Sequence, residues 1–160
     1  MVVVAGACSA IADRRFFVAR RSGWIEREGK DMNYLIVFLG AGIGGAGRHG
    51  VNMLAARVFG VGFPLGTFTV NVLGCFLMGV IAGIFSFRGH LPQEARLFLT
   101  TGILGGFTTF SAFSLDAALL WERGEGALVA FYVAASVILS LAGGFAGLAA
   151  TRLVLAGGVL

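Results

Sequence analysis

The chain has 160 residues, of which 58% are hydrophobic and only 12% are charged, and its mean hydropathy is +0.91. A soluble domain of this length has too much surface to hide so many apolar side chains, so the composition indicates a membrane protein. The formal charge of +4 is small and spread out, which argues against a nucleic-acid partner. Cys8 and Cys75 lie far apart and suggest neither a metal cluster nor a disulfide framework.

Residues 1–31 differ in composition from the rest of the chain. They hold six of the twelve basic residues and four of the eight acidic ones, and no lysine occurs from Met32 onward. The apolar opening has no basic residues before it, which argues against a secretory signal. We interpret 1–31 as a polar or disordered extension and expect the functional protein to begin at Met32. A genuine cytoplasmic tail is the alternative.

Four later segments are long and apolar enough to cross a bilayer core about 30 Å thick as helices. They run from about 34 to 56, 65 to 87, 95 to 121 and 127 to 155. Short connections that contain glycine, proline or charged residues separate them. The sequence therefore predicts an all-α membrane domain over 32–160, with four transmembrane helices and both termini on one side.

Four short helices leave little room for an aqueous pathway, so a homodimer is expected. From Met32 onward, Arg88, Arg96 and Arg152 lie on the predicted side of the termini, and Arg57 and Arg123 lie on the other. This weak bias would let the chain insert in both orientations and pair antiparallel. Residues 1–31 raise the count to nine against two and should impose one orientation.

Two polar residues in the first two spans are candidates for function, because polar groups inside a membrane are costly. Arg48 is either an interfacial arginine or a fixed positive charge that draws anions toward a pore. Asn71 lies inside an apolar run and needs hydrogen-bond partners. Its amide either bonds a neighbouring helix or coordinates an anion.

The third span gathers glycines, hydroxyls and aromatic rings between residues 102 and 114. Gly105-Gly106 followed by Thr108-Thr109 is a weak helix former, so we predict a break there. A break frees backbone carbonyls, which are tolerated at membrane depth only inside protein or beside a cavity. Such oxygens suit a hard cation such as sodium.

Two pairs of side chains recur at helical spacing. Phe110 and Phe113 share a helical face and either contact lipid or present positive ring edges to a small anion. Ser136 and Ser140 either bond to carbonyls of their own helix or form a polar track beside a pore.

Three motifs resemble those of the Fluc/CrcB fluoride channels in order and spacing. They are GAGIGGAGRHG at 40–50, GTFTVNVLG at 66–74 and GILGGFTTFSAFS at 102–114. The resemblance covers Met32 to about Leu155. Two positions depart from it: Phe68 stands where leucine is common, and Ala112 where the family often has threonine. The second removes a hydroxyl near the expected pore.

The resemblance implies passive export of fluoride through an antiparallel, dual-topology homodimer in the inner membrane of the cell. The implied fluoride pathway comprises Asn71, Phe110, Phe113, Ser136 and Ser140, and we predict that Arg48 and Thr109 also belong to it. The carbonyls of Gly105 and Thr108 from both subunits would hold a structural sodium ion.

Other classes of protein fit the sequence less well. A small dual-topology, proton-coupled multidrug exporter needs a carboxylate deep in the membrane. After Met32 only Asp116 falls within a predicted span, and it lies toward the end of that span. A non-transporting scaffold subunit would explain the glycines but not the Gly-Gly-Phe-Thr-Thr run. An enzyme is not expected, because no nucleophile–base pair or metal cluster is evident.

Overall fold

The computed structural model describes the backbone of residues 3–87 and 92–156, and the side chains of residues 31–86 and 92–155. Every regular element in these ranges is helical, as predicted. The elements are α1 (Val3–Phe59), α2 (Leu65–Phe87), α3 (Gln93–Leu97), the π-helix η1 (Phe98–Leu104), α4 (Gly105–Phe107), α5 (Phe110–Glu122) and α6 (Gly126–Ala156).

The chain divides into two units, and the division falls between Leu35 and Ile36. Residues 3–30, interpreted from the sequence as a polar or disordered extension, have the helical backbone of α1. The second unit contains the remainder of α1 and all later elements. The predicted boundary between residues 31 and 32 stays a prediction.

Three helical stretches among the described residues are long and apolar enough to cross a membrane: Leu65–Ser86, Gln93–Glu122 and Gly126–Leu155. They correspond to the second, third and fourth predicted spans. The predicted first span, 34–56, is helical within α1 but is not one of these three. Its glycines, with Arg48 and His49, lower its hydropathy. A membrane crossing by this segment therefore stays a prediction.

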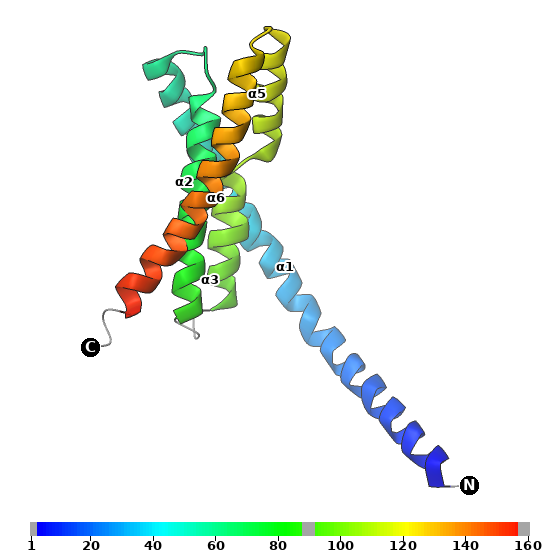
Figure 1. Cartoon of the computed structure of the whole chain (residues 1–160). Coiled ribbons are helices and arrows are strands. Elements are labelled where there is room, and N and C mark those ends of the chain that lie inside the picture. Colours follow the sequence, from blue (N-terminus) through cyan, green and yellow to red (C-terminus); the bar gives the residue numbers. More distant parts are fainter. Residues whose placement is uncertain (1–2, 88–91, 157–160) are drawn as a thin grey trace. The chain divides into compact units, whose positions relative to one another are not determined.

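Helices α2 and α6 run side by side (Figure 1), and glycines allow their backbones to meet. A Cβ atom added at Gly79 of α2 would collide with the carbonyl of Gly144. One added at Gly147 of α6 would collide with the carbonyl of Phe76. Both glycines are buried, so the two helices approach more closely than larger residues would permit.

The glycines of the predicted first span form a second close contact, with the first half of the third span. A Cβ atom at Gly40 would lie 2.8 Å from the Cα atom of Gly102. One at Gly44 would collide with the carbonyl oxygen of Ile103, and one at Gly106 with the backbone of Ala41. These contacts fix η1 and α4 against the second half of α1.

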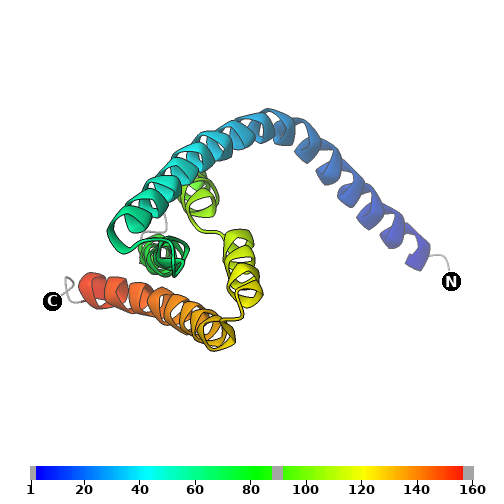
Figure 2. The ribbon, with the colours of Figure 1, turned by 90° about the horizontal axis from the view of Figure 1, so that it is seen from above.

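Helices α5 and α6 follow one another closely in the chain (Figure 2), and a buried apolar cluster lies between them. A turn at Gly124 joins the two helices. Gly124 has a φ of 78°, a value that favours glycine, and its N–H donates to the carbonyl of Trp121. Phe113, Leu120 and Tyr132 form the cluster, and Phe63 packs edge-on against Tyr132 with 5.5 Å between ring centroids. This packing fixes the second half of the third span against α6.

Candidate functional site

The third span is interrupted at the position predicted from its glycines and threonines. Helix α4 ends at Phe107 and α5 begins at Phe110, and the two threonines between them have extended backbones. Thr108 has φ −79° and ψ 158°, and Thr109 has φ −156° and ψ 118°. Two consecutive extended residues end the helical hydrogen-bond ladder of the span.

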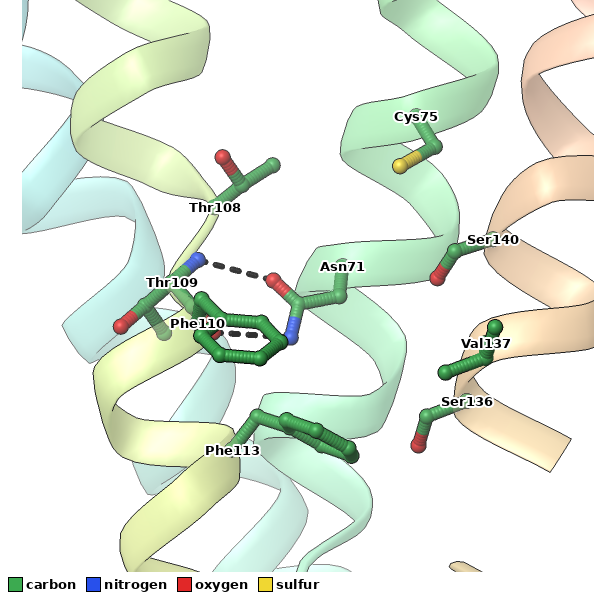
Figure 3. Close-up of a pocket in the computed structure, with 9 residues that line it drawn as sticks. All are labelled: Asn71, Cys75, Thr108, Thr109, Phe110, Phe113, Ser136, Val137 and Ser140. Atoms are coloured by element: carbon green, nitrogen blue, oxygen red, sulfur yellow. Dashed lines mark hydrogen bonds between the residues drawn. The ribbon is translucent and has the colours of Figure 1, made fainter. Parts of the chain in front are cut away.

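Asn71 of α2 holds the interruption through both backbone polar groups of Thr109 (Figure 3). The Thr109 N–H donates to Asn71 Oδ1 at 2.8 Å, and Asn71 Nδ2 donates to the Thr109 carbonyl at 3.0 Å. The amide side chain thus supplies one donor and one acceptor, as a neighbouring strand would. One Nδ2 hydrogen is left over, because a primary amide has two.

The interruption also frees the two carbonyls predicted to bind a cation. In a continuous helix, the Gly105 carbonyl would accept from the Thr109 N–H and the Thr108 carbonyl from the Ala112 N–H. The Thr109 N–H donates instead to Asn71, and the Ala112 N–H donates to Thr109 Oγ1 at 3.1 Å. Both carbonyls therefore lose their usual helical donors, which fits a role as cation ligands.

A hollow of about 250 Å³ lies beside the interruption, between α2, the start of α5 and α6 (Figure 3). Its lining residues are Asn71, Cys75, Thr108, Thr109, Phe110, Phe113, Ser136, Val137 and Ser140. Six of the seven residues predicted for the pathway are among them. The fold thus brings together residues that lie on three separate helices.

Arg48 is the predicted pathway residue that does not line this hollow. It lies on α1, where its side chain is half-buried. The face of α1 that carries Gly40 and Gly44 packs against η1 and α4. The hollow is lined instead by residues of α2, α5 and α6. The structure of one chain therefore does not place Arg48 at the hollow.

The Ser136 hydroxyl is buried in the wall of the hollow, and no residue that the structure describes bonds to it. The residue is only 4% exposed, and its Oγ makes no hydrogen bond to any group in the described part of the chain. The alternative in which this hydroxyl bonds to a carbonyl of its own helix is therefore not observed. A buried hydroxyl without a partner is costly, so its donor is available to a ligand or water.

The two phenylalanines occupy different environments. Phe113 is 8% exposed and packs against Tyr132, with 5.2 Å between ring centroids. Phe110 is 78% exposed and lies tilted against Phe113, with 5.4 Å between centroids. Phe113 is therefore part of the core as well as the wall, whereas Phe110 forms the rim.

Several residues without a role predicted from the sequence lie near the site. Cys75 and Val137 line the hollow. Tyr132, which is fully buried, donates its hydroxyl to Asp116 at 3.4 Å. Asp116 in turn lines a second hollow of about 250 Å³ beside the connection from α1 to α2. The helical spacing of Tyr132, Ser136 and Ser140 was the available signal, since the three share one face of α6.

Comparison with known proteins points to one family. The sequence model of the family described as "CrcB-like protein, Camphor Resistance (CrcB)" matches residues 35–148. The protein named Fluoride-specific ion channel FluC 2, from Nitrobacter hamburgensis, is 60% identical over 121 residues, which are 76% of this chain and 98% of that protein. Fluoride-specific ion channel FluC from Rhodopseudomonas palustris strain BisB5 is 59% identical over 121 residues, with the same coverage of 76% and 98%.

A third relative, Fluoride-specific ion channel FluC from Methylobacterium nodulans, is 58% identical over 121 residues, or 76% of this chain and 97% of that protein. The names of these relatives are those of ion channels rather than enzymes. With the apolar helices described above, they indicate a multi-pass membrane protein. The chain belongs to the CrcB-like family.

Proposed function

We propose that the protein is a fluoride-specific channel of the inner membrane, through which fluoride leaves the cytoplasm down its gradient. The support from comparison is the name of its relatives, each a fluoride-specific ion channel. The observation that carries the proposal is the hollow beside the interrupted span. There the Ser136 hydroxyl, which has no partner within residues 31–86 and 92–155, lies among apolar and aromatic side chains.

The lining of the hollow suits a small, strongly hydrated anion. To enter, fluoride must exchange some of its water for other donors, and the exchange must leave it free to move on. The remaining Nδ2 hydrogen of Asn71 and the hydroxyls of Ser136 and Ser140 supply such donors. The edges of Phe110 and Phe113 carry partial positive charge, which attracts an anion weakly. Because Arg48 lies outside the hollow, we keep for it only a long-range electrostatic role.

The working form in this proposal is an antiparallel homodimer with dual topology. The hollow of a single chain is open at its rim, where Phe110 is largely exposed, so a second chain would complete its wall. From Met32 onward the flanking arginines are divided three against two, which permits both orientations. Residues 1–31 add six basic residues on one side and favour a single orientation.

The proposal includes a structural sodium ion held by the carbonyls of Gly105 and Thr108 from both subunits. The fit rests on the diversion of the Thr109 and Ala112 N–H groups to other acceptors. Four carbonyl oxygens without a carboxylate favour a monovalent ion over calcium. Such an ion would neutralise carbonyl dipoles at the centre of the dimer. Transport would then need sodium for assembly but not a sodium gradient.

Fluoride efflux from liposomes tests the proposed function. Purified protein is reconstituted into vesicles loaded with potassium fluoride, and efflux is followed with a fluoride electrode after valinomycin is added. We expect rapid efflux of fluoride, little of chloride, and no dependence on a pH gradient. Efflux equal to that of protein-free vesicles would refute the proposal. Efflux that requires a proton gradient would favour an exporter.

Labelling a cysteine placed in the 122–126 loop tests dual topology. In a Cys8→Ser/Cys75→Ser background, Gly124 is unsuitable because of its positive φ, so Glu125→Cys is used. The 32–160 chain should be labelled in comparable amounts from both sides of the membrane. The full chain should be labelled predominantly from the side opposite its termini. One-sided labelling of the 32–160 chain would refute dual topology without affecting the proposed selectivity for fluoride.

A further inference from the structure

The wall of the hollow has a regularity that the proposed pathway leaves unexplained. On α6, Ser136 and Ser140 are one helical turn apart, and both line the hollow. On α2, Asn71 has a counterpart one turn later, and this residue is Cys75. Two neighbouring helices thus each present two polar side chains to the same space. Three of the four belong to the proposed pathway, and Cys75 is the fourth.

Cys75 lines both this hollow and a third, apolar hollow. Its thiol is free and its side chain is half-buried. In Figure 3 it follows Asn71 along α2, across from Ser140 on α6. Cys75 and Ser140 also line an apolar hollow of about 320 Å³ between α2 and α6, whose other lining residues are Met78, Gly79, Ala82, Leu141, Gly144, Phe145 and Leu148. The thiol therefore stands at the end of the polar wall.

A second, independent observation indicates that this space receives a ligand. Ser136, also in the wall, is 4% exposed, and among the residues described its hydroxyl has no partner. Buried hydroxyls are normally satisfied, so the cavity should hold a group that accepts from it. A ligand that bonds Ser136 and then Ser140 passes directly by the thiol of Cys75.

We propose that Cys75 lines the fluoride pathway one turn beyond Asn71, and that its thiol is a modification site at which the pathway can be closed. The inference rests on the proposed function. A thiol is a weaker donor than a hydroxyl and has a larger atom, so Cys75 should bind fluoride weakly and narrow its passage. Serine at this position should increase fluoride flux, because a hydroxyl is a stronger donor and a smaller group, whereas valine should reduce it.

The reagent that tests the site is 2-sulfonatoethyl methanethiosulfonate. The Cys75 sulfur, after losing its proton to the buffer, attacks the sulfenyl sulfur of the reagent. A disulfide forms between the Cys75 sulfur and the sulfonatoethyl sulfur. The sulfur–sulfur bond of the reagent breaks, and methanesulfinate leaves with its electron pair. The product carries one negative charge inside a hollow of about 250 Å³. Fluoride would be excluded both by bulk and by like charge.

The experiment uses the full chain with Cys8→Ser, so that Cys75 is the only thiol. We expect complete labelling by mass spectrometry and a fall in fluoride efflux of about tenfold or more, since one unpaired charge raises a barrier by over 1.4 kcal/mol. Methyl methanethiosulfonate, which adds a small neutral group, should reduce efflux less. The Cys8→Ser/Cys75→Ser protein should conduct and resist both reagents.

Leu73→Cys in the Cys8→Ser/Cys75→Ser background is the matched control. Leu73 lies two residues before Cys75 on α2, is exposed, and does not line the hollow. The charged reagent should react with it more slowly than with Cys75, and its adduct should leave efflux unchanged. Labelled Cys75 with undiminished efflux would overturn the inference. So would a Cys75 that reacts no faster than the control cysteine.

The outcomes also separate this inference from the proposed function. Efflux from the untreated protein tests whether the chain conducts fluoride at all. The relative labelling rates of Cys75 and Leu73→Cys need no fluoride and test whether the thiol faces an aqueous space. Rapid labelling of Cys75 in a chain that conducts no fluoride would refute the proposed channel. It would leave Cys75 as a modification site in an aqueous cavity.

Discussion

The α2–α6 pair and the third span are both built on close backbone contacts through glycine, yet one is continuous and the other is interrupted. Gly79 and Gly147 bring α2 and α6 together without altering either helix. Gly44 and Gly106 do the same for α1 and the third span, but two residues after Gly106 the backbone becomes extended. Glycine contacts alone therefore do not break a helix.

The difference lies in what replaces the lost helical hydrogen bonds. At the interruption, Asn71 receives the Thr109 N–H and donates to its carbonyl, and Thr109 Oγ1 receives the Ala112 N–H. In the α2–α6 pair the polar side chain at the contact, Thr151, bonds instead to carbonyls of Gly147 and Val80. At the interruption, side chains thus take over backbone N–H groups that a continuous helix would pair internally.

Gly44→Ala should have the largest effect on this comparison. Its Cβ would collide with the Ile103 carbonyl and lie 2.8 Å from the Phe107 nitrogen, so α4 must move. We expect destabilisation of about 2–3 kcal/mol and loss of fluoride efflux. Thermal unfolding in detergent and gel filtration measure the first effect. Gly45→Ala is the control, because nothing lies within 4 Å of its added Cβ. Equal stability of the two variants would contradict the packing argument.

Asn71→Asp should come next, because it breaks one of the two bonds to Thr109. The carboxylate can still accept the Thr109 N–H, but it places a second oxygen against the Thr109 carbonyl, which loses its donor. The expected cost is about 1–3 kcal/mol. Efflux should be lost while the elution volume of the assembly is retained. Thr69→Val, at an exposed position two residues before Asn71, should behave as wild type. Normal efflux through Asn71→Asp would remove Asn71 from the pathway.

The two phenylalanine variants should separate stability from transport. Phe113→Ile should slow efflux strongly and cost about 1–2 kcal/mol of stability, since this ring packs against Tyr132 in the core. Phe110→Ile should slow efflux with a change in stability below about 0.5 kcal/mol, because its ring is exposed at the rim. If both variants conduct like wild type, the rings serve lipid contact or packing alone.

Thr109→Val should disturb the interruption less than Asn71→Asp does. It removes the hydroxyl that caps α5 but keeps both backbone bonds to Asn71. Loss of a cap costs about 1 kcal/mol. Thr101→Val, an exposed threonine of η1, is the control. A loss of stability in Thr109→Val comparable to that in Asn71→Asp would show that the cap, rather than the amide, holds the interruption.

Much of the fold and most of the candidate site were predictable from local sequence. The Gly-Gly-Phe-Thr-Thr run predicted the place of the interruption, because low helix propensity destabilises a helix locally. The partner of Thr109 was not predictable, since Asn71 lies 38 positions earlier and only the packing of α2 against the third span brings them together. The sequence left open whether Asn71 bonds a neighbour or an anion. The structure shows the first and leaves one hydrogen for the second.

Cys75 and Tyr132 were not predicted as site residues because of their residue types, although their positions on the helices fit the site. Cys75 follows Asn71 by one helical turn, yet a thiol in an apolar run resembles ordinary core. Tyr132 precedes Ser136 by one turn, and its bond to Asp116 depends on how α5 packs against α6. Arg48 was predicted to lie near the pathway because a charged side chain inside a membrane is costly and is therefore a functional candidate. A single sequence does not say which face of α1 contacts which helix.

The two hydrogen bonds between Asn71 and Thr109 should also restrain bending of the third span at the interruption. A pair of extended residues between two helices has the form of a hinge, but bending it would require both bonds to open. At about 1 kcal/mol each, the open form would be populated at only a few per cent. The interruption should therefore be closed in all but a few per cent of molecules. The hollow beside it should then keep its shape.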